Sequence, residues 1–436
     1  MFLRTVVVIT ALLAGVSVVA ARAQRPDAFG QSRDHPAIAY SSGPVADQVS
    51  ALNERLRSGA ARLAFDPETG YLRGALDALG IAVDSQVLVF SQTSSQAAMI
   101  DKSNPRAVYF SDTAAIGWVR RGSVLELAAQ DPRQGTIFYT LHQSSTATPQ
   151  FQRDNNCLRC HLSWDTRAVP GPLVLTTHPR KNEREYASGG AVDHREPIRN
   201  RWGGWFVTGS RVPARHMGNR AMLHPDAADP EHTPPAPKLA SVAGQFDAQG
   251  YPSPHSDIVA LLVLEHQAHL TNLLTRAGWE ARYAAYDVGS PIRAGEGAAA
   301  DDARGARVRG AVDEMVDYML FVDEVALGAP VAGSSGFAER FAAQGPRDRQ
   351  GRSLRDFDLT ERIMRYPLSY MIYSPAFDGL PPDAKAAAYD RLWRILSAQE
   401  QGPKYAHLSL ARRRAIVEIL RETKADLPAY FEAIAR

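Results

Sequence analysis

The sequence predicts an α+β protein in which a small antiparallel sheet precedes a loop-rich segment and a mainly helical region follows. Two patterns indicate this order. Short runs of β-branched and aromatic residues, separated by turn residues, fill positions 83–141, and apolar residues at helical spacing recur after position 257. The 436 residues are 45% hydrophobic and 22% charged, which excludes a collagen-like, wholly disordered or disulfide-stapled protein.

Residues 1–23 have the pattern of an export signal. Arg4 gives a positive start, and the Ala21-Arg22-Ala23 site supplies the small residues that signal peptidase recognises. The apolar run between them has about 16 residues, fewer than the roughly 20 that a membrane anchor needs. We therefore expect a periplasmic or otherwise exported protein with no stable membrane span after cleavage. Loss of Arg4 and Arg22 takes the formal net charge from +2 to zero. The overall charge of the mature chain therefore does not favour binding to nucleic acid.

Residues 24–141 are expected to hold one helix and then the sheet. Apolar residues at helical spacing predict the helix over 45–62, and the Asp-Pro-Glu-Thr-Gly turn at 66–70 ends it. Five strands should follow, with turn residues between them. They are Val87–Phe90, Ala107–Phe110, Ile116–Val119, Val124–Leu127 and Ile137–Thr140.

Residues 142–256 should be loop-rich, because Pro, Gly, Asn and Asp recur throughout this stretch. The region 257–436 should be helical. Its predicted helices are 258–285, 311–326, 354–373, 383–399 and 408–435. Residues 289–310, rich in Gly, Ala, Asp and Arg, are expected to form a flexible linker.

The chain has only two cysteines, Cys157 and Cys160, and His161 follows the second directly. Residues three and four apart lie on one face of a helical turn, so both thiols can reach the two vinyl groups of one porphyrin. His161 would then be the proximal ligand of the iron. This C-x-x-C-H spacing is the attachment pattern of haem c, and at these residues the chain resembles the c-type cytochromes.

Three further stretches resemble uncharacterised large exported bacterial proteins that carry a single haem c motif. They are Asn104-Pro105-Arg106, Arg201-Trp202-Gly203-Gly204-Trp205 and Arg215-His216-Met217-Gly218-Asn219. The resemblance implies one covalently bound haem c and indicates no substrate.

Other uses of a C-x-x-C pair stay open but are less favoured. A thioredoxin-like motif would follow a strand of a βαβ unit, whereas this pair follows the polar segment 150–156. A structural zinc site needs four Cys or His ligands, and a disulfide across three residues constrains little. The segment Glu265–His269 also resembles a zinc-protease H-E-x-x-H motif, but with its first pair reversed, which displaces the base.

A sixth protein ligand would set the potential of the iron. Met217 is the first candidate, because a Gly-containing loop could bring it to the porphyrin. His266 and His269, which share a helix face with Leu262 and Leu273, are lower-ranked candidates. The weaker candidates are His194, His216, Met99 and Met222.

Residues 151–220 contain twelve Lys or Arg and six Asp or Glu. This excess suggests arginines that pair with haem propionates and a docking face for an acidic redox partner protein. Trp202 and Trp205 are expected in the core or against the haem.

We therefore expect an exported mono-haem c-type cytochrome that transfers electrons. The chain is much longer than a small carrier needs, so a second reading is a haem c-dependent oxidoreductase, peroxidase-like or dehydrogenase-like, with an open sixth coordination site. Polar residues beside such a site would be His194, His216 or Arg215. A haem-bearing sensor or binding module is the third reading.

Overall fold

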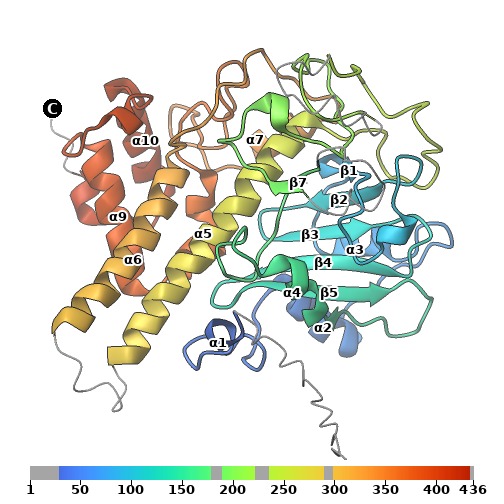
Figure 1. Ribbon diagram of the computed structural model, residues 1–436, viewed down its shortest axis with the longest axis horizontal. Coiled ribbons are helices and arrows are strands. Elements are labelled where there is room, and N and C mark those ends of the chain that lie inside the picture. Colours follow the sequence, from blue (N-terminus) through green and yellow to red (C-terminus); the bar gives the residue numbers. More distant parts are fainter. Residues whose placement is uncertain (1–28, 178–188, 221–234, 289–297, 433–436) are drawn as a thin grey trace, which may run out of the picture.

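The computed structural model describes residues 29–177, 189–220, 235–288 and 298–432. A six-stranded sheet forms one end of the molecule and a group of helices the other, and the long helix α5 (Ile258–Val288) runs between them (Figure 1). The predicted α+β class is thus confirmed. The predicted signal, residues 1–23, lies outside the described residues.

The sheet is an antiparallel meander with strand order β1-β2-β3-β4-β5-β6. Its strands are β1 (Val87–Val89), β2 (Arg106–Phe110), β3 (Ala114–Trp118), β4 (Val124–Asp131), β5 (Gly135–His142) and β6 (Gln152–Arg153). The first five confirm the predicted strands. The two residues of β6 are polar and too few to show an alternating pattern, so the sequence did not indicate that strand.

One face of the sheet packs against the N-terminal helices. In β4, Leu125, Leu127 and Ala129 are buried, and they share a core with residues of α2 (Gln48–Arg57) and α3 (Leu72–Ala78). Helix α2 begins later than predicted because the Asp47 side chain caps it, accepting hydrogen bonds from Val49 N–H and Ser50 N–H, and it ends at Arg57. Helix α3 was not predicted.

The opposite face of the sheet packs in part against α5. Val87 of β1 and Val108 and Phe110 of β2 share one core with the buried residues of this helix. Helix α5 confirms the prediction over 258–285. Most of it up to Ala281 is buried, because the sheet lies on one side and α6 (Ala298–Met319) on the other.

The predicted linker 289–310 is wrong over 298–310, where the chain is helical; residues 289–297 lie outside the described part. Gly305 and Gly310 each cost a helix about 1 kcal/mol, but Ala and Arg are strong helix formers and α6 packs against both α5 and α9 (Pro382–Leu396). The predicted helix 311–326 ends earlier, at Met319. Phe321 and Asp323 have positive φ values of 56° and 62° and therefore cannot continue it.

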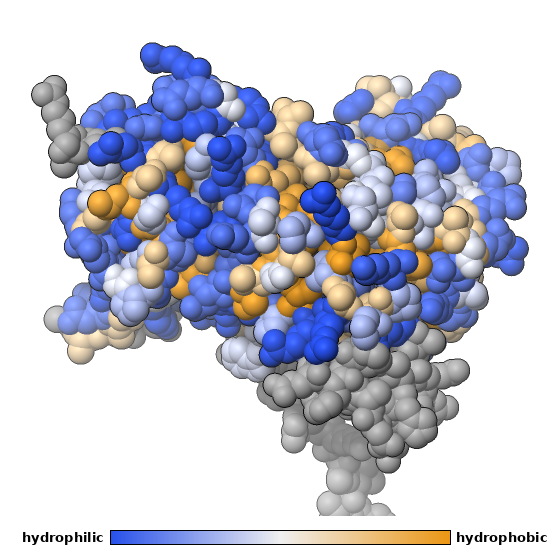
Figure 2. Space-filling view, turned by 90° about the horizontal axis from the view of Figure 1, so that it is seen from above, coloured by the Kyte–Doolittle hydropathy of each residue, from blue (hydrophilic) through white to orange (hydrophobic). Residues whose placement is uncertain are grey.

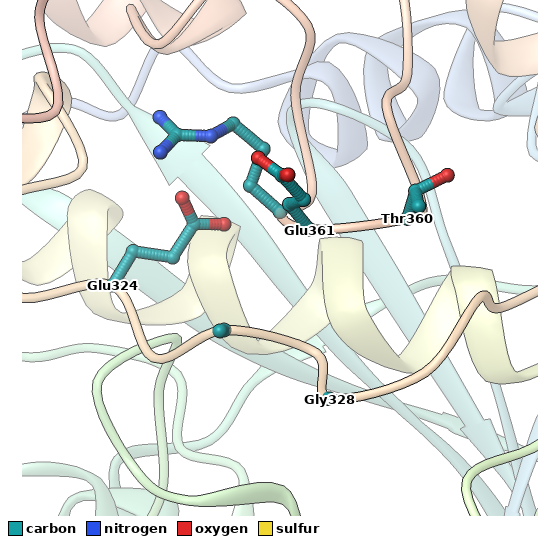
Figure 3. Close-up of a pocket in the computed structure, with 6 residues that line it drawn as sticks. Glu324, Gly328, Thr360 and Glu361 are labelled. Carbon is teal, nitrogen blue, oxygen red and sulfur yellow. The ribbon is translucent and has the colours of Figure 1, made fainter.

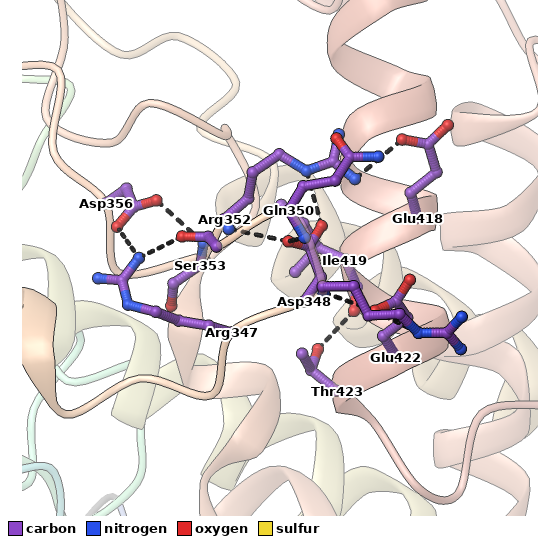
Figure 4. A network of polar contacts seen from close by, with 12 residues as sticks. Arg347, Asp348, Gln350, Arg352, Ser353, Asp356, Glu418, Ile419, Glu422 and Thr423 are labelled. Atoms are coloured by element: carbon purple, nitrogen blue, oxygen red, sulfur yellow. Dashed lines mark hydrogen bonds and ion pairs between the residues drawn. The ribbon is translucent and has the colours of Figure 1, made fainter.

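The predicted helix 354–373 is wrong: only its last turn, at Tyr370–Tyr373, is helical. Tertiary hydrogen bonds override the apolar spacing here, because Leu359 accepts from Val331 N–H and Glu361 accepts from Leu327 N–H. A polar network fastens the preceding turn to α10 (Leu410–Thr423), as Arg352 binds both Asp348 and Glu418 (Figure 4).

The C-terminal helices cover the far side of α6. Helix α9 confirms the prediction over 383–399, and α10 matches the first part of the predicted helix 408–435. The shorter helices are α1 (Gly30–Arg33), α4 (Leu158–His161), α7 (Phe337–Ala343) and α8 (Pro375–Asp378), and a small second sheet pairs β7 (Leu175–Thr176) with β8 (Gly190–Ala191).

Seen from above, hydrophilic residues dominate both ends of the molecule, and hydrophobic ones gather in a central band where the sheet end meets the helical end (Figure 2). No helix in the described ranges is both long and apolar enough to cross a membrane.

Candidate functional site

The C-x-x-C-H motif lies on two short consecutive turns. A 3₁₀ turn at Asn155–Cys157 leads into α4, and the Asp154 side chain caps it by accepting a hydrogen bond from Asn156 N–H. The Cys157 thiol is half-buried and that of Cys160 is exposed, and the two are not joined in a disulfide. The structure therefore presents both sulfurs and the following histidine from one stretch of helical backbone.

His161 is held in a defined orientation. Its Nδ1 lies 2.9 Å from Gly171 O, and its ring packs against Phe138 of β5 with 4.7 Å between the ring centroids. Because the carbonyl can only accept, Nδ1 carries the proton and Nε2 is the nitrogen with a lone pair for a metal. Burial lowers the pKa of His161, against the opposing effect of the Gly171 hydrogen bond, and so favours this neutral form.

Gly171 is a position where a larger residue would force its surroundings to move. A Cβ atom built there would lie 1.8 Å from Asn272 Oδ1 of α5. Asn272 also donates to Pro172 O over 3.0 Å, so α5 holds the loop segment whose carbonyl orients His161.

The sheet face beside His161 carries a strip of small residues. Ala115, Gly117 and Ala128 lie on this face, and Ala128 pairs directly with Phe138, on which His161 packs. A small cavity of about 50 Å³ continues the strip beneath α5. Its lining includes Ala115, Ala128, Pro172, Leu264 and Ala268.

An ion pair lies at one end of this strip. Arg106 of β2 donates from Nη1 to Glu126 Oε2 of β4 over 3.0 Å, and its guanidinium lies over Gly117, where a Cβ would be 3.3 Å from Arg106 Nε. Glu126 also accepts from Ser94 over 2.9 Å and from Ser95. Arg106 Nε is buried and has no hydrogen-bond partner.

These residues fit haem c. The chain offers two unpaired thiols, an oriented imidazole, a flat apolar strip and an unsatisfied buried guanidinium donor in one region. The first three could attach, ligate and shield a porphyrin, and the fourth suits its carboxylates.

Two of the candidate distal ligands, His266 and His269, are engaged elsewhere. His266 Nδ1 lies 2.9 Å from His194 Nδ1, and its Nε2 lies 2.8 Å from Ser369 Oγ. His269 Nε2 lies 3.0 Å from Arg195, and its Nδ1 lies 3.5 Å from an oxygen of Asp193. Burial lowers the pKa of His266 to about 3 and that of His269 to about 4, so both are neutral members of a buried polar cluster.

Met217 does not meet His161 in the structure. Its N–H donates to Arg201 O, and Trp205 in the same segment pairs with Val89 of β1. His161 packs on β5, four strand spacings from β1, which is about 19 Å at the usual 4.8 Å per strand.

The weaker distal candidates differ in their burial and surroundings. His216 is buried, accepts from Gly218 N–H and packs edge-on against Trp202. Met99 is 38% exposed. Trp202 and Trp205 are core residues on the β1 side. Met222 lies outside the described residues.

The predicted basic excess is partly neutralised within the fold. Arg167 pairs with Glu314, Arg195 pairs with Asp193, and the buried Arg201 lies 2.9 Å from the buried Glu265. An acidic partner would therefore meet fewer free cations than the sequence count indicates.

A second hollow lies between the segments 324–328 and 360–362 and has a volume of about 460 Å³ (Figure 3). Glu324 lines it and accepts from Ile363 N–H over 2.8 Å. Burial raises the pKa of Glu324 to about 7. No pattern in the sequence indicated this hollow.

Sequence reasoning also missed Glu126, Gly117 and Gly171. Arg106 belongs to the Asn104-Pro105-Arg106 stretch, for which the sequence predicts no role. Within the described ranges, no three His, Cys, Asp or Glu side chains are arranged to hold a metal ion.

Comparison with known protein families, with curated proteins and with solved structures finds no match to the chain.

Proposed function

We propose that the chain is an exported c-type haem protein that transfers electrons, with one haem attached to Cys157 and Cys160 and ligated by His161. One observation carries the proposal: the histidine that follows the two free thiols donates its Nδ1 proton to the Gly171 carbonyl. A backbone carbonyl is a usual partner of a metal-ligating histidine, because it fixes the tautomer and the ring orientation.

The bound haem would supply an iron that changes its oxidation state. The chain would supply the environment of that iron. Gly171 and Phe138 keep the His161 ring in place, and the apolar residues Ala115, Gly117 and Ala128 on the same sheet face would help to exclude water from the neighbourhood of the iron. Such burial tunes the potential of a haem.

A second candidate function is a haem c-dependent oxidoreductase with an open sixth coordination site. It is favoured by the positions of the three ranked distal ligands, since Met217 lies toward β1 and both ring nitrogens of His266 and His269 already have partners. A haem without a sixth protein ligand can bind a small molecule there.

Attachment is tested by producing the full chain in a bacterial periplasm that contains haem c maturation enzymes. We expect haem that stays on the polypeptide in denaturant, and its loss in C157S/C160S. His142→Ala, on an exposed histidine of β5, is the control and should keep its haem. A wild-type chain without covalent haem would overturn the proposal.

The absorption spectrum separates the two functions. An electron carrier with a sixth protein ligand should show a low-spin spectrum that carbon monoxide leaves unchanged. An open site should give a spectrum that shifts when carbon monoxide binds to the reduced protein.

A further inference from the structure

We propose that Arg106 binds a propionate carboxylate of the haem, an assignment that rests on the proposed function. The guanidinium of Arg106 is held in place at Nη1 by Glu126 and has a buried Nε without a partner. A buried donor without a partner is costly. Several other arginines share this feature, so it is the position of Arg106 on the sheet face where His161 packs that points to an acceptor outside the protein chain.

The position of Arg106 matches this role. Glu126 lies two residues from Ala128 along β4, about 7 Å at the rise of an antiparallel strand, and Ala128 pairs with Phe138, on which His161 packs. The strip of small residues thus has the proximal histidine near one end and the guanidinium at the other. Arg106 therefore lies on the sheet face where His161 packs, and it would be the residue of this face that holds a carboxylate of a haem attached at the motif.

Gly117 makes the guanidinium accessible from the strip. It lies beneath Arg106 Nε and Glu126 Oε2, and its missing side chain lets the Arg106 plane lie close to the sheet. The planar fork of arginine favours a carboxylate, with which it forms directed, charge-assisted hydrogen bonds. A purely structural role in joining β2 to β4 would need only the existing bond to Glu126.

Thermal unfolding of four chains distinguishes these roles. Arg106→Gln is made in the haem-carrying chain and in the haem-free C157S/C160S chain. A propionate contact predicts that R106Q lowers Tm by about 3 °C or more beyond its effect in the haem-free chain. Equal shifts in the two backgrounds would show that Arg106 acts only through Glu126 and would overturn the assignment.

Arg120→Gln is the matched control. Arg120 lies in the turn that follows β3 and pairs with Asp247 over 3.0 Å. We expect R120Q to shift Tm equally in both backgrounds. A wild-type chain with no covalent haem would overturn the proposed function and this assignment together, whereas attached haem with equal R106Q shifts overturns this assignment alone.

The midpoint potential gives a second readout that is independent of stability. Removal of a cation near the haem favours the more positive, oxidised iron, so R106Q should lower the potential. Arg106→Lys keeps the positive charge but loses the planar guanidinium group, so it should shift the potential less than R106Q does. This variant also provides the test if R106Q does not fold. A potential that both variants leave unchanged would contradict the assignment.

Discussion

At the scale of single residues, the motif loop depends on backbone positions rather than on its cysteines. The segment from His161 to Gly171 turns back on itself through Arg167 and Ala168, both with φ of 59°, in the left-handed region that non-glycine residues rarely adopt. Arg167 is tied to Glu314 of α6, and its carbonyl accepts from Arg276 of α5. Helices far away in the sequence therefore maintain the strained turn that carries the Gly171 carbonyl back to His161.

Gly171→Ala tests this dependence. The new Cβ would overlap Asn272 Oδ1, so either the asparagine or the loop must move. We expect the free energy of unfolding to fall by about 1–3 kcal/mol, the usual cost of overpacking, in urea titrations. Gly190→Ala is the control, because a Cβ at that exposed glycine has nothing within 4 Å. Equal stability of G171A and G190A would show that the loop adapts freely.

Glu324 should make stability depend on pH. Its folded pKa of about 7 exceeds that of an unfolded glutamate, so the folded state binds more protons between about pH 4.5 and 7. Stability contributed by this group is therefore lost as the pH rises through that window. Glu324→Gln should remove the loss and raise the free energy of unfolding at pH 8, relative to wild type, by on the order of 2 kcal/mol.

The measurement for Glu324 is chemical unfolding at pH 4.5 and pH 8 with Glu361→Gln as the control. Glu361 lines the same hollow but is exposed. The same change of stability between the two pH values in E324Q and in wild type would contradict the prediction.

At the scale of elements, local patterns predicted the strands well and the loops poorly. The five strands were found because short runs of β-branched and aromatic residues lie between turn residues, and α5 was found because its apolar residues continue over a long stretch without a helix breaker. The helix expected over 354–373 has apolar residues at helical spacing, but hydrogen bonds from Leu327 and Val331 fix an irregular path instead. No pattern within the segment itself could reveal those partners.

The same difference holds for the candidate site. Cys157, Cys160 and His161 were identified because their spacing is local. Arg106 and Glu126 are twenty residues apart and meet only through the register of β2, β3 and β4. The candidate distal ligands were chosen by residue type and local pattern, neither of which reveals the partners that His266 and His269 have in the buried cluster.

Helix α6 shows how packing compensates for a weak local preference, and Gly310→Ala tests it. Gly310 lies inside the helix, and a Cβ there would have nothing within 4 Å. We expect G310A to raise the free energy of unfolding by about 0.5–1 kcal/mol, because alanine loses less backbone entropy than glycine. Gly328→Ala, at a positive φ of 71° in a loop, should instead be destabilising. Urea titrations that show no gain for G310A would contradict a helix at this position.

At the scale of the whole molecule, α5 makes one cooperative unit of two differently built halves. Its residues share a core with Val87 and Val108 of the sheet and also with α6 and the C-terminal helices. The sheet cannot bury that face without α5, and α5 cannot bury its length without both neighbours. Exposure of either side would therefore leave a large apolar surface in water.

Leu270→Ala should thus weaken the sheet and the helices together. Leu270 is fully buried in α5, and its truncation should lower the free energy of unfolding by about 2–5 kcal/mol. Hydrogen exchange should show an equal loss of protection in β4 and in α9, because both open only in the global transition. Leu410→Ala is the control, because this side chain is 75% exposed. It should change neither the free energy of unfolding nor the protection of β4 and α9 from hydrogen exchange. A loss confined to α9 would mean that the sheet half is stable without α5 and that the interface along this helix contributes little to it.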